Sequence, residues 1–483
     1  MNFKPVFHVI AWLLGVIGLL MGLCGLVSFL HGEPSTRALG QSSAGTIAAA
    51  AALWTLTRNN QELSRRDGLG VVAFGWLLAG IAGAAPYVLS GVIASPVAAF
   101  FETVSGMTTT GATVIPILEG VPKGLLLWRA ITQFIGGMGV LILVVAILPF
   151  AGAGGMQLFR AEMPGPTKDR IEPRVASTAK MLWGVYVLLT VLLIFLLRLG
   201  GVDWFDAVCH AFTTMSSGGF STHTASVSAF RSAYVEGLLA VFMLLAGMSF
   251  ALHYRVLRGE WSSWWRDGEV RFFLGVFLLC SLAGSVVLQQ ARAASGLGWG
   301  GAFREVAFTC SSLMSTTGFT TGDYERWPVL LKAMLASLML LGGCAGSTAG
   351  AIKAGRVQVM LKTVVREVRL FMQPSAVIPV RLGRKSLPDD ILLSILSFVA
   401  LYLLVALVGV LAMLPFTPDI QTAGSAVIAC MGNIGPGFSA VGPSLNYSAI
   451  PEAGQVLLTL LMLIGRLELY TVLVIFLPAF WRK

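Results

Sequence analysis

Long apolar runs alternate with short polar segments from one end of the chain to the other. A run of about 18 or more apolar residues is long enough to cross the hydrocarbon core of a bilayer as an α-helix. The first run is too long for the core of a signal peptide, and no small-residue cleavage site follows it. The pattern predicts about ten membrane-spanning helices, at residues 6–30, 41–57, 69–89, 126–150, 181–200, 235–256, 272–290, 329–352, 390–414 and 453–480.

The composition also indicates an integral membrane protein. Of the 483 residues, 56% are hydrophobic and only 12% are charged, and this charged share is about half that of a soluble chain. Such a composition excludes a soluble enzyme of several domains, a disordered chain and a secreted disulfide scaffold. The composition therefore predicts that a lipid bilayer surrounds the protein.

The basic residues predict the orientation of the chain in the membrane. The net charge is +10, from 33 Lys and Arg against 23 Asp and Glu. If the N-terminus is cytoplasmic, 23 of the 33 basic residues fall on cytoplasmic segments, which agrees with the positive-inside rule for ten spans. We therefore expect both termini in the cytoplasm, and the basic excess predicts no nucleic-acid partner.

Four short segments share a pattern of small polar residues leading to a glycine. The aligned glycines are 108, 99 and 117 residues apart, at positions 111, 219, 318 and 435. Internal repetition of this kind indicates a repeated structural unit. We call these stretches glycine segments 1 to 4: Thr108–Thr113, Ser216–Thr222, Ser315–Gly322 and Gly432–Phe438.

A short apolar run of about 12 residues precedes each glycine segment, as at Pro96–Met107 and Phe205–Met215. A helix of about 12 residues is about 18 Å long and does not cross a bilayer. Each repeat therefore predicts a span (M1), a half-helix, a glycine segment and a second span (M2). The predicted fold is an all-α polytopic membrane protein with these units: two N-terminal helices in 1–67 and pore repeats in 68–175, 176–268, 269–385 and 386–483.

Non-helical backbone at membrane depth is tolerated only where it is buried in protein or lines an aqueous path. Four such segments around one axis would direct their carbonyl oxygens to a common centre, and carbonyl rings replace the hydration shell of a monovalent cation. Glycine permits the backbone angles that this arrangement requires. The alternative is four ordinary external loops, but their common register makes that interpretation much weaker.

Residues 342–350 contain four glycines within a predicted span. Each glycine costs a helix about 1 kcal/mol relative to alanine, so we expect the helix to break here and form a movable gate. A small-residue contact between helices is the alternative. Arg466 lies in the middle of the last run, where a charge costs at least about 2.5 kcal/mol. It either lines the conduction path or forms a structural ion pair, although Glu468 lies on another helix face.

The chain resembles the Trk/Ktr/HKT superfamily of potassium transporters over nearly its whole length, and its bacterial TrkH branch most closely. The resemblance rests on the four glycine segments and the two extra N-terminal spans. Three further motifs carry it: Gly136-Gly137-Met138-Gly139, Gly342-Gly343-Cys344-Ala345-Gly346-Ser347-Thr348-Ala349-Gly350 and Gly465-Arg466-Leu467-Glu468.

The resemblance implies a potassium-selective filter and a gate. A serine in place of the first filter glycine is associated with sodium permeation in this superfamily, and Gly111 is present here. The fourth segment departs from the hydroxyl pattern, which implies an imperfect fourfold filter. The implied potassium-binding residues are Thr109, Thr110, Gly111, Ser217, Gly218, Gly219, Thr316, Thr317, Gly318, Asn433, Ile434 and Gly435. The implied gate residues are Gly346, Ser347, Thr348, Gly350, Lys353 and Arg466, with Lys353 holding the loop and Arg466 approaching it.

Several acidic residues are candidates for lesser roles. Glu119, Asp323 and Glu325 either raise the cation concentration at the outer mouth or are solvated loop charges. The positive end of the helix dipole stabilises a carboxylate in the first turns of a helix. We therefore expect the carboxylates early in the half-helices to cap these helices. These are Glu102, Asp206 and Glu305.

Motifs of other protein classes are missing from the sequence. The six cysteines have no C-x-x-C spacing and are predicted to be free buried thiols. The five histidines form no H-E-x-x-H, and no P-loop occurs. We therefore expect neither an enzyme nor an organic cofactor on this chain, and K⁺ is the expected transported ion.

The predicted function is potassium uptake across the bacterial cytoplasmic (inner) membrane. The resemblance implies a homodimer controlled by a cytosolic TrkA-like subunit that binds NAD or ATP/ADP. The basic stretches 160–180 and 353–385 are candidate docking surfaces. A sodium-permeable or weakly selective relative is the nearest alternative. A membrane-embedded enzyme and a non-conducting assembly or sensor subunit are more distant ones.

Overall fold

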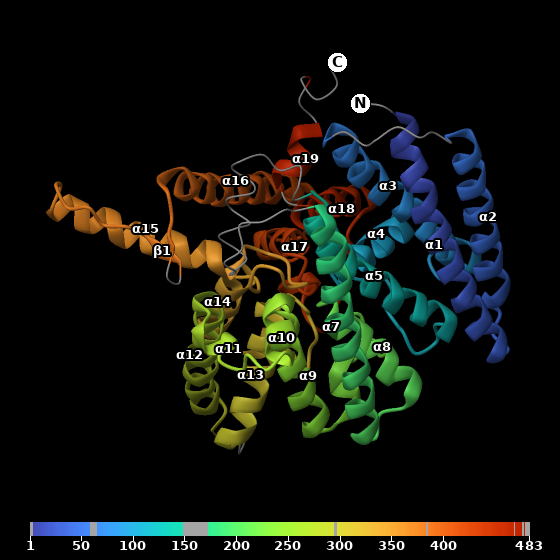
Figure 1. Ribbon diagram of the computed structural model, residues 1–483. Helices are drawn as coiled ribbons and strands as arrows, with labels where there is room; N and C mark the ends of the chain where they lie inside the picture. Colours follow the sequence, from blue (N-terminus) through green and yellow to red (C-terminus); the bar gives the residue numbers. More distant parts are fainter. Residues whose placement is uncertain are drawn as a thin grey trace.

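The computed structural model is mostly helical and describes residues 3–57, 65–147, 172–293, 297–382, 385–467, 469–475 and 478. The first three helices lie together at one side of the molecule (Figure 1). They are α1 (Phe3–Leu30), α2 (Ser35–Leu56) and α3 (Arg65–Ser90). A Cβ at Gly18 would lie 3.2 Å from Ile47 N, so glycine permits the close approach of α1 and α2.

Five of the described helices are long and apolar enough to cross a membrane, and one bent pair brings the number to six. The long helices after α3 are α5 (Lys123–Ile147), α7 (Glu172–Leu199), α12 (Gly268–Ala291) and α16 (Asp389–Met413). The expected total of ten spans is not confirmed, because several apolar runs form shorter or broken helices. Three expected boundaries between units also fall inside helices, at 67–68 in α3, at 175–176 in α7 and at 268–269 in α12.

The four predicted half-helices are present, and each ends directly before its glycine segment. Three of them begin with a side-chain cap, from Ser95, Asp203 and Asp419, whose oxygens accept backbone N–H groups of the first turn. These helices are α4 (Pro96–Met107), α8 (Trp204–Met215), α13 (Trp299–Met314) and α17 (Ile420–Met431).

Three predicted spans are interrupted. The run 329–352 breaks as expected: α14 (Val329–Met339) is followed by irregular backbone and then by α15 (Ala354–Met372). The run 235–256 was expected to be continuous, but α9 (Ala233–Ala246) and α10 (Phe250–Leu257) meet at a 103° bend. The last run is also divided, into α18 (Glu452–Arg466) and α19 (Leu469–Ile475).

The remaining elements are short. The all-α expectation needs one small correction, because β1 (Arg381–Leu382) and β2 (Lys385–Ser386) form an antiparallel hairpin. This hairpin follows α15, which projects from the body of the molecule (Figure 1). The other short elements are α11 (Ser263–Arg266) and the 3₁₀ turns η2 (Ser226–Phe230), η4 (Tyr324–Arg326), η5 (Leu414–Phe416), η6 (Ser439–Val441) and η7 (Tyr447–Ala449).

The half-helices pack in a closed cycle. α8 contacts α5, α13 contacts α9, α17 contacts α14, and α4 contacts α18. Each half-helix thus packs against the helix that follows the preceding glycine segment, and the first packs against the helix that follows the fourth. This arrangement brings the four glycine segments to one place in the molecule.

Candidate functional site

The four glycine segments share one backbone geometry despite their different sequences. The first key residue of each has a positive φ of 53–56°, at Thr109, Ser217, Thr316 and Asn433. The glycine two positions later has a φ of 74–100°. Left-handed backbone at a residue with a side chain is strained by about 1–3 kcal/mol, so four such residues indicate a geometry that the surrounding structure imposes.

The segments form a closed ring in chain order. A Cβ at Gly111 would lie 2.1 Å from Gly218 O. The corresponding distances are 1.8 Å from Gly219 to Thr317 O, 2.0 Å from Gly318 to Ile434 O, and 2.7 Å from Gly435 to Thr110 O. Real Cβ atoms essentially never lie within 3.0 Å of another heavy atom in this way. All four positions therefore require glycine, and the contact that closes the ring is the loosest.

Polar side chains brace the ring from outside. Gln133 of α5 donates from Nε2 to Gly218 O at 2.7 Å and accepts at Oε1 from Phe220 N at 3.0 Å. Tyr447 donates to Gly435 O at 2.6 Å. These contacts join glycine segments 2 and 4 to neighbouring parts of the bundle. Gln133 has a signal in the sequence, since it lies four residues after Arg129 within an apolar run, but sequence reasoning missed it.

A buried ion pair joins glycine segments 1 and 2. Arg129 Nε lies 2.9 Å from Glu102 Oε1, and the two side chains are 2% and 0% exposed. Glu102 accepts from Val114 N, and Arg129 donates from Nη1 to Ser221 O, both at 2.9 Å. The expected capping role of Glu102 is therefore wrong, because its carboxylate holds the end of segment 1.

The other two carboxylates expected to cap half-helices also have different partners. Asp203 caps α8 instead, while Asp206 Oδ1 accepts from Thr222 Oγ1 at 2.7 Å. Glu305 Oε2 lies 3.1 Å from Arg292 Nη1. Both carboxylates thus connect their helices to neighbouring backbone segments.

The acidic residues expected near the outer mouth connect loops. Glu119 accepts hydrogen bonds from the hydroxyl and the backbone N–H of Thr224, and these bonds lower the pKa of Glu119 below its ordinary value. Glu325 accepts from Ser439 N at 2.6 Å. Asp323 accepts from the backbone of Glu325. The three carboxylates fix loop positions rather than stand alone as solvated charges.

The irregular backbone between α14 and α15, residues 340–353, lies directly against the glycine ring; we call it the intramembrane loop. Gly350 N donates to Thr316 Oγ1 at 2.7 Å. Thr348 Oγ1 lies 3.0 Å from the carbonyl oxygen of Met215, the last residue of α8. A Cβ at Gly350 would lie 2.3 Å from Gly432 O. The loop thus touches the ring at segments 3 and 4 and at the end of the helix that leads into segment 2.

Two basic side chains hold the intramembrane loop. Arg466, which is 5% exposed, donates to Thr348 O at 2.7 Å and to Gly136 O at 3.1 Å. Lys353 Nζ donates to Ala349 O within the loop. Gly346 O accepts from Phe250 N at 3.1 Å, and Ser347 Oγ donates to Cys344 O at 2.6 Å. The six predicted gate residues therefore lie together, while Glu468 lies outside the described residues.

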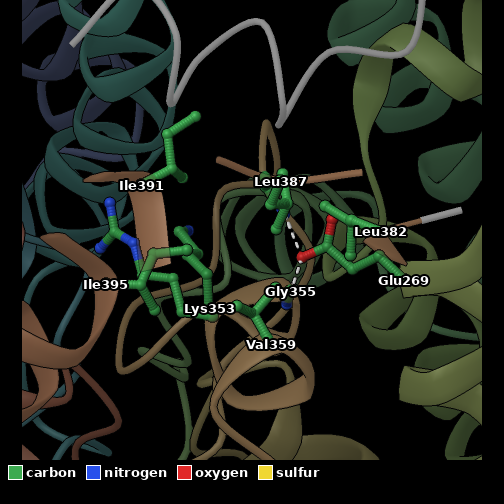
Figure 2. A pocket seen from close by; sticks show the side chains of 10 residues that line it. Glu269, Lys353, Gly355, Val359, Leu382, Leu387, Ile391 and Ile395 are labelled. Atoms are coloured by element: carbon green, nitrogen blue, oxygen red, sulfur yellow. Dashed lines mark hydrogen bonds between the residues drawn. The ribbon is translucent and has the colours of Figure 1, made fainter. Parts of the chain in front are cut away.

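Sequence reasoning missed one further contact of the loop. Glu269, in the first turn of α12, accepts at Oε1 from Ala345 N at 2.9 Å and from Gly355 N at 2.7 Å (Figure 2). A single glutamate at the start of a predicted span carries no signal for this role. Only the folded chain brings it to the loop.

Within the described residues, no group of three or more His, Cys, Asp or Glu side chains could hold a metal ion. The expected binding of potassium by the filter residues stays a prediction. All six cysteines are free, and five of them are buried; Cys280 is half-buried. The prediction of free buried thiols is thus confirmed for five of the six.

Comparison with known proteins identifies the family. Residues 37–483 match the family model TrkH, described as a cation transport protein. The Trk system potassium uptake protein TrkH of Escherichia coli (strain K12) is 38% identical over 491 residues, covering 100% of both chains. Trk system potassium uptake protein TrkG of the same organism is 36% identical over 89% of each chain. The crystal structure of the potassium transporter TrkH from Vibrio parahaemolyticus is 33% identical and superposes with a TM-score of 0.91, with full coverage of both chains. With its helices and apolar spans, the chain belongs to the TrkH family of multi-pass membrane cation transport proteins.

Proposed function

We propose that this chain takes up potassium across the cytoplasmic membrane, through a pathway lined by the four glycine segments. The observation that carries the proposal is the closed ring, in which each glycine lies against a carbonyl group of the next segment. The relatives named as potassium uptake proteins support the same ion. So does Gly111, whose replacement by serine is associated with sodium permeation in the superfamily.

The ring provides the chemistry that a dehydrated cation needs. Backbone carbonyls at Thr109 and Thr110, and at the matching positions of the other segments, substitute for water oxygens. The four half-helices end at residues 107, 215, 314 and 431, directly before the ring, so the negative ends of their dipoles favour a cation there. The positions that match Thr109 and Thr110 in the other three segments are Ser217, Gly218, Thr316, Thr317, Asn433 and Ile434.

The intramembrane loop acts as the gate in this proposal. It lies against segments 3 and 4, and Gly350 N donates a hydrogen bond to the hydroxyl oxygen of Thr316. Arg466 adds a buried positive charge that binds the loop and repels cations on the same side. Ions pass when the loop moves away from the ring, which breaks the bonds at Thr348 and Gly350.

The proposed assembly is a homodimer bound to a cytosolic nucleotide-binding subunit. The words "Trk system" in the relatives' names support one part of this assembly, a complex with other Trk subunits. The projecting helix α15 supports a partner, because its exposed apolar side chains lie at helical spacing. A second copy covering this stripe would remove an exposed apolar patch. α1 begins and α19 ends at the same side of the molecule (Figure 1), as expected if both termini are cytoplasmic. The exposed apolar stripe on α15 comprises Leu361, Val364, Val365 and Val368.

Rubidium and sodium uptake by the purified protein in liposomes tests the proposal. The variant Gly318→Ser places a Cβ 2.0 Å from Ile434 O at a φ of 83°, so it should reduce potassium-competed rubidium uptake and admit sodium. Gly322→Ser is the matched control, because a Cβ there meets nothing within 4 Å. Equal selectivity in both variants and the wild type contradicts the proposed filter. Strong sodium uptake by the wild type would instead favour a weakly selective transporter.

A further inference from the structure

We infer that Glu269 is a positioning residue that sets the resting position of the intramembrane loop. This inference rests on the proposed role of the loop as a gate. Arg466 binds the middle of the loop at Thr348, whereas Glu269 binds the backbone on both sides of that point, at Ala345 and Gly355.

One carboxylate oxygen makes both contacts. Glu269 Oε1 accepts from Ala345 N at 2.9 Å and from Gly355 N at 2.7 Å, and Figure 2 shows dashed lines that leave one carboxylate oxygen of Glu269 beside Gly355. Hydrogen bonds to an ionised acceptor are about twice as strong as neutral ones. The residue is 9% exposed, so water competes weakly for the two N–H groups. The carboxylate therefore clamps together two backbone positions that are ten residues apart.

The position of the carboxylate is itself fixed. Asp267 caps α12 by accepting from Glu269 N at 3.0 Å and from Val270 N at 2.9 Å. α12 packs against α13, the half-helix that leads into glycine segment 3. Glu269 therefore ties the resting position of the loop to the helices α12 and α13, and this helix pair also positions part of the ring.

The opposite end of the clamp lies on a helix that a partner can pull. Gly355 is in the first turn of α15, which projects from the molecule (Figure 1). A displacement of α15 moves Gly355 N away from Glu269 and so opens one side of the clamp. A small cavity lies beside the clamp, and Ala345, Gly355, Lys353 and Arg356 line it together with apolar side chains (Figure 2). These apolar side chains are Val359, Leu382, Leu387, Ile391 and Ile395.

Two variants disturb the clamp from its two sides. Glu269→Ala removes the acceptor. Gly355→Ala places a Cβ 2.9 Å from Glu269 Oε1 and displaces the carboxylate, while alanine favours the helix more than glycine does. Glu269→Gln keeps an oxygen acceptor without the charge. Glu260→Ala is the matched control, because the exposed carboxylate of Glu260 accepts from Ser263 Oγ and takes no part in the clamp.

Two readouts report on the loop independently. The first is rubidium uptake by the full-length protein in liposomes with no regulatory subunit added. The second is the rate at which a water-soluble maleimide labels Cys344, a buried cysteine next to Ala345, with the labelled peptide identified by mass. Loss of a charge-assisted hydrogen bond shifts an equilibrium by about tenfold or more. We expect both readouts to rise by about tenfold in Glu269→Ala and in Gly355→Ala, to rise less in Glu269→Gln, and to stay at the wild-type value in Glu260→Ala.

Wild-type labelling and uptake in folded Glu269→Ala overturn the inference. If that variant does not fold, Gly355→Ala decides by the same criterion. Deletion of residues 346–350 separates this inference from the proposed function. Failure of the deleted protein to take up rubidium contradicts the proposed pore, while faster Cys344 labelling in the two variants still supports the clamp.

Discussion

Replacement of Arg466 by alanine is the most informative perturbation of the proposed gate. The guanidinium makes two hydrogen bonds, to Thr348 O at 2.7 Å and to Gly136 O at 3.1 Å. The first joins the intramembrane loop to α18, and the second joins α18 to α5. Only the first depends on the loop being in its resting position.

The size of the effect follows from that distinction. A hydrogen bond from a charged donor contributes about 1.5–3 kcal/mol. Loss of the bond to Thr348 destabilises the closed loop by this amount, whereas loss of the bond to Gly136 affects the open and closed positions alike. The ratio of open to closed protein should therefore rise by about 10- to 150-fold.

Rubidium uptake into liposomes by purified Arg466→Ala, without a regulatory subunit, measures this ratio. Arg326→Ala is the control for loss of one positive charge, because that side chain is 81% exposed and pairs with the loop carboxylate of Asp323. We expect a large rise in basal uptake for Arg466→Ala and no change for Arg326→Ala. Uptake at the wild-type level by correctly folded Arg466→Ala would refute the holding role of this residue.

Three further predictions concern the ring and its supports. Arg129→Met leaves the carboxylate of Glu102 buried without its partner, which costs about 3–5 kcal/mol; thermal unfolding in detergent should show a lower melting temperature, partly restored by adding Glu102→Leu. Gly219→Ala places a Cβ 1.8 Å from Thr317 O, so competition of potassium with rubidium uptake should weaken, while Gly237→Ala, where a Cβ meets nothing within 4 Å, should behave as wild type. The lowered pKa of Glu119 means that its contribution to stability is complete at neutral pH and is lost as the pH falls through that pKa; Glu119→Gln should therefore show a smaller fall in melting temperature on acidification, and an unchanged fall would contradict this assignment.

Elements with strong local signals could be predicted from the sequence. Both ends of the half-helix Pro96–Met107 were predicted correctly. Ser95 and Pro96 favour the start of a helix, and the hydroxyl-rich glycine segment 1 follows the end of this helix. The break after Met339 was also predicted, since four glycines in nine residues weaken a helix strongly. Both features depend on residues that are neighbours in the chain.

Features that depend on distant residues could not be predicted. The 103° bend between α9 and α10 follows a single glycine, Gly247, and its stabilising contacts come from the intramembrane loop. Cys344 N donates to Gly247 O at 2.7 Å, and Phe250 N donates to Gly346 O at 3.1 Å. Without the position of that loop, the run 235–256 is indistinguishable from an ordinary span. The clamp by Glu269 and the closure of the ring between segments 4 and 1 escaped prediction for the same reason.

The central claim is that the glycine ring is a selective cation pathway closed by the intramembrane loop. Rubidium uptake by purified protein lacking residues 346–350, in liposomes with excess potassium or sodium outside, tests it most directly. The account predicts uptake well above that of the full-length protein, abolished by potassium and little changed by sodium. No uptake by the folded, deleted protein, or uptake that sodium abolishes equally, would contradict it.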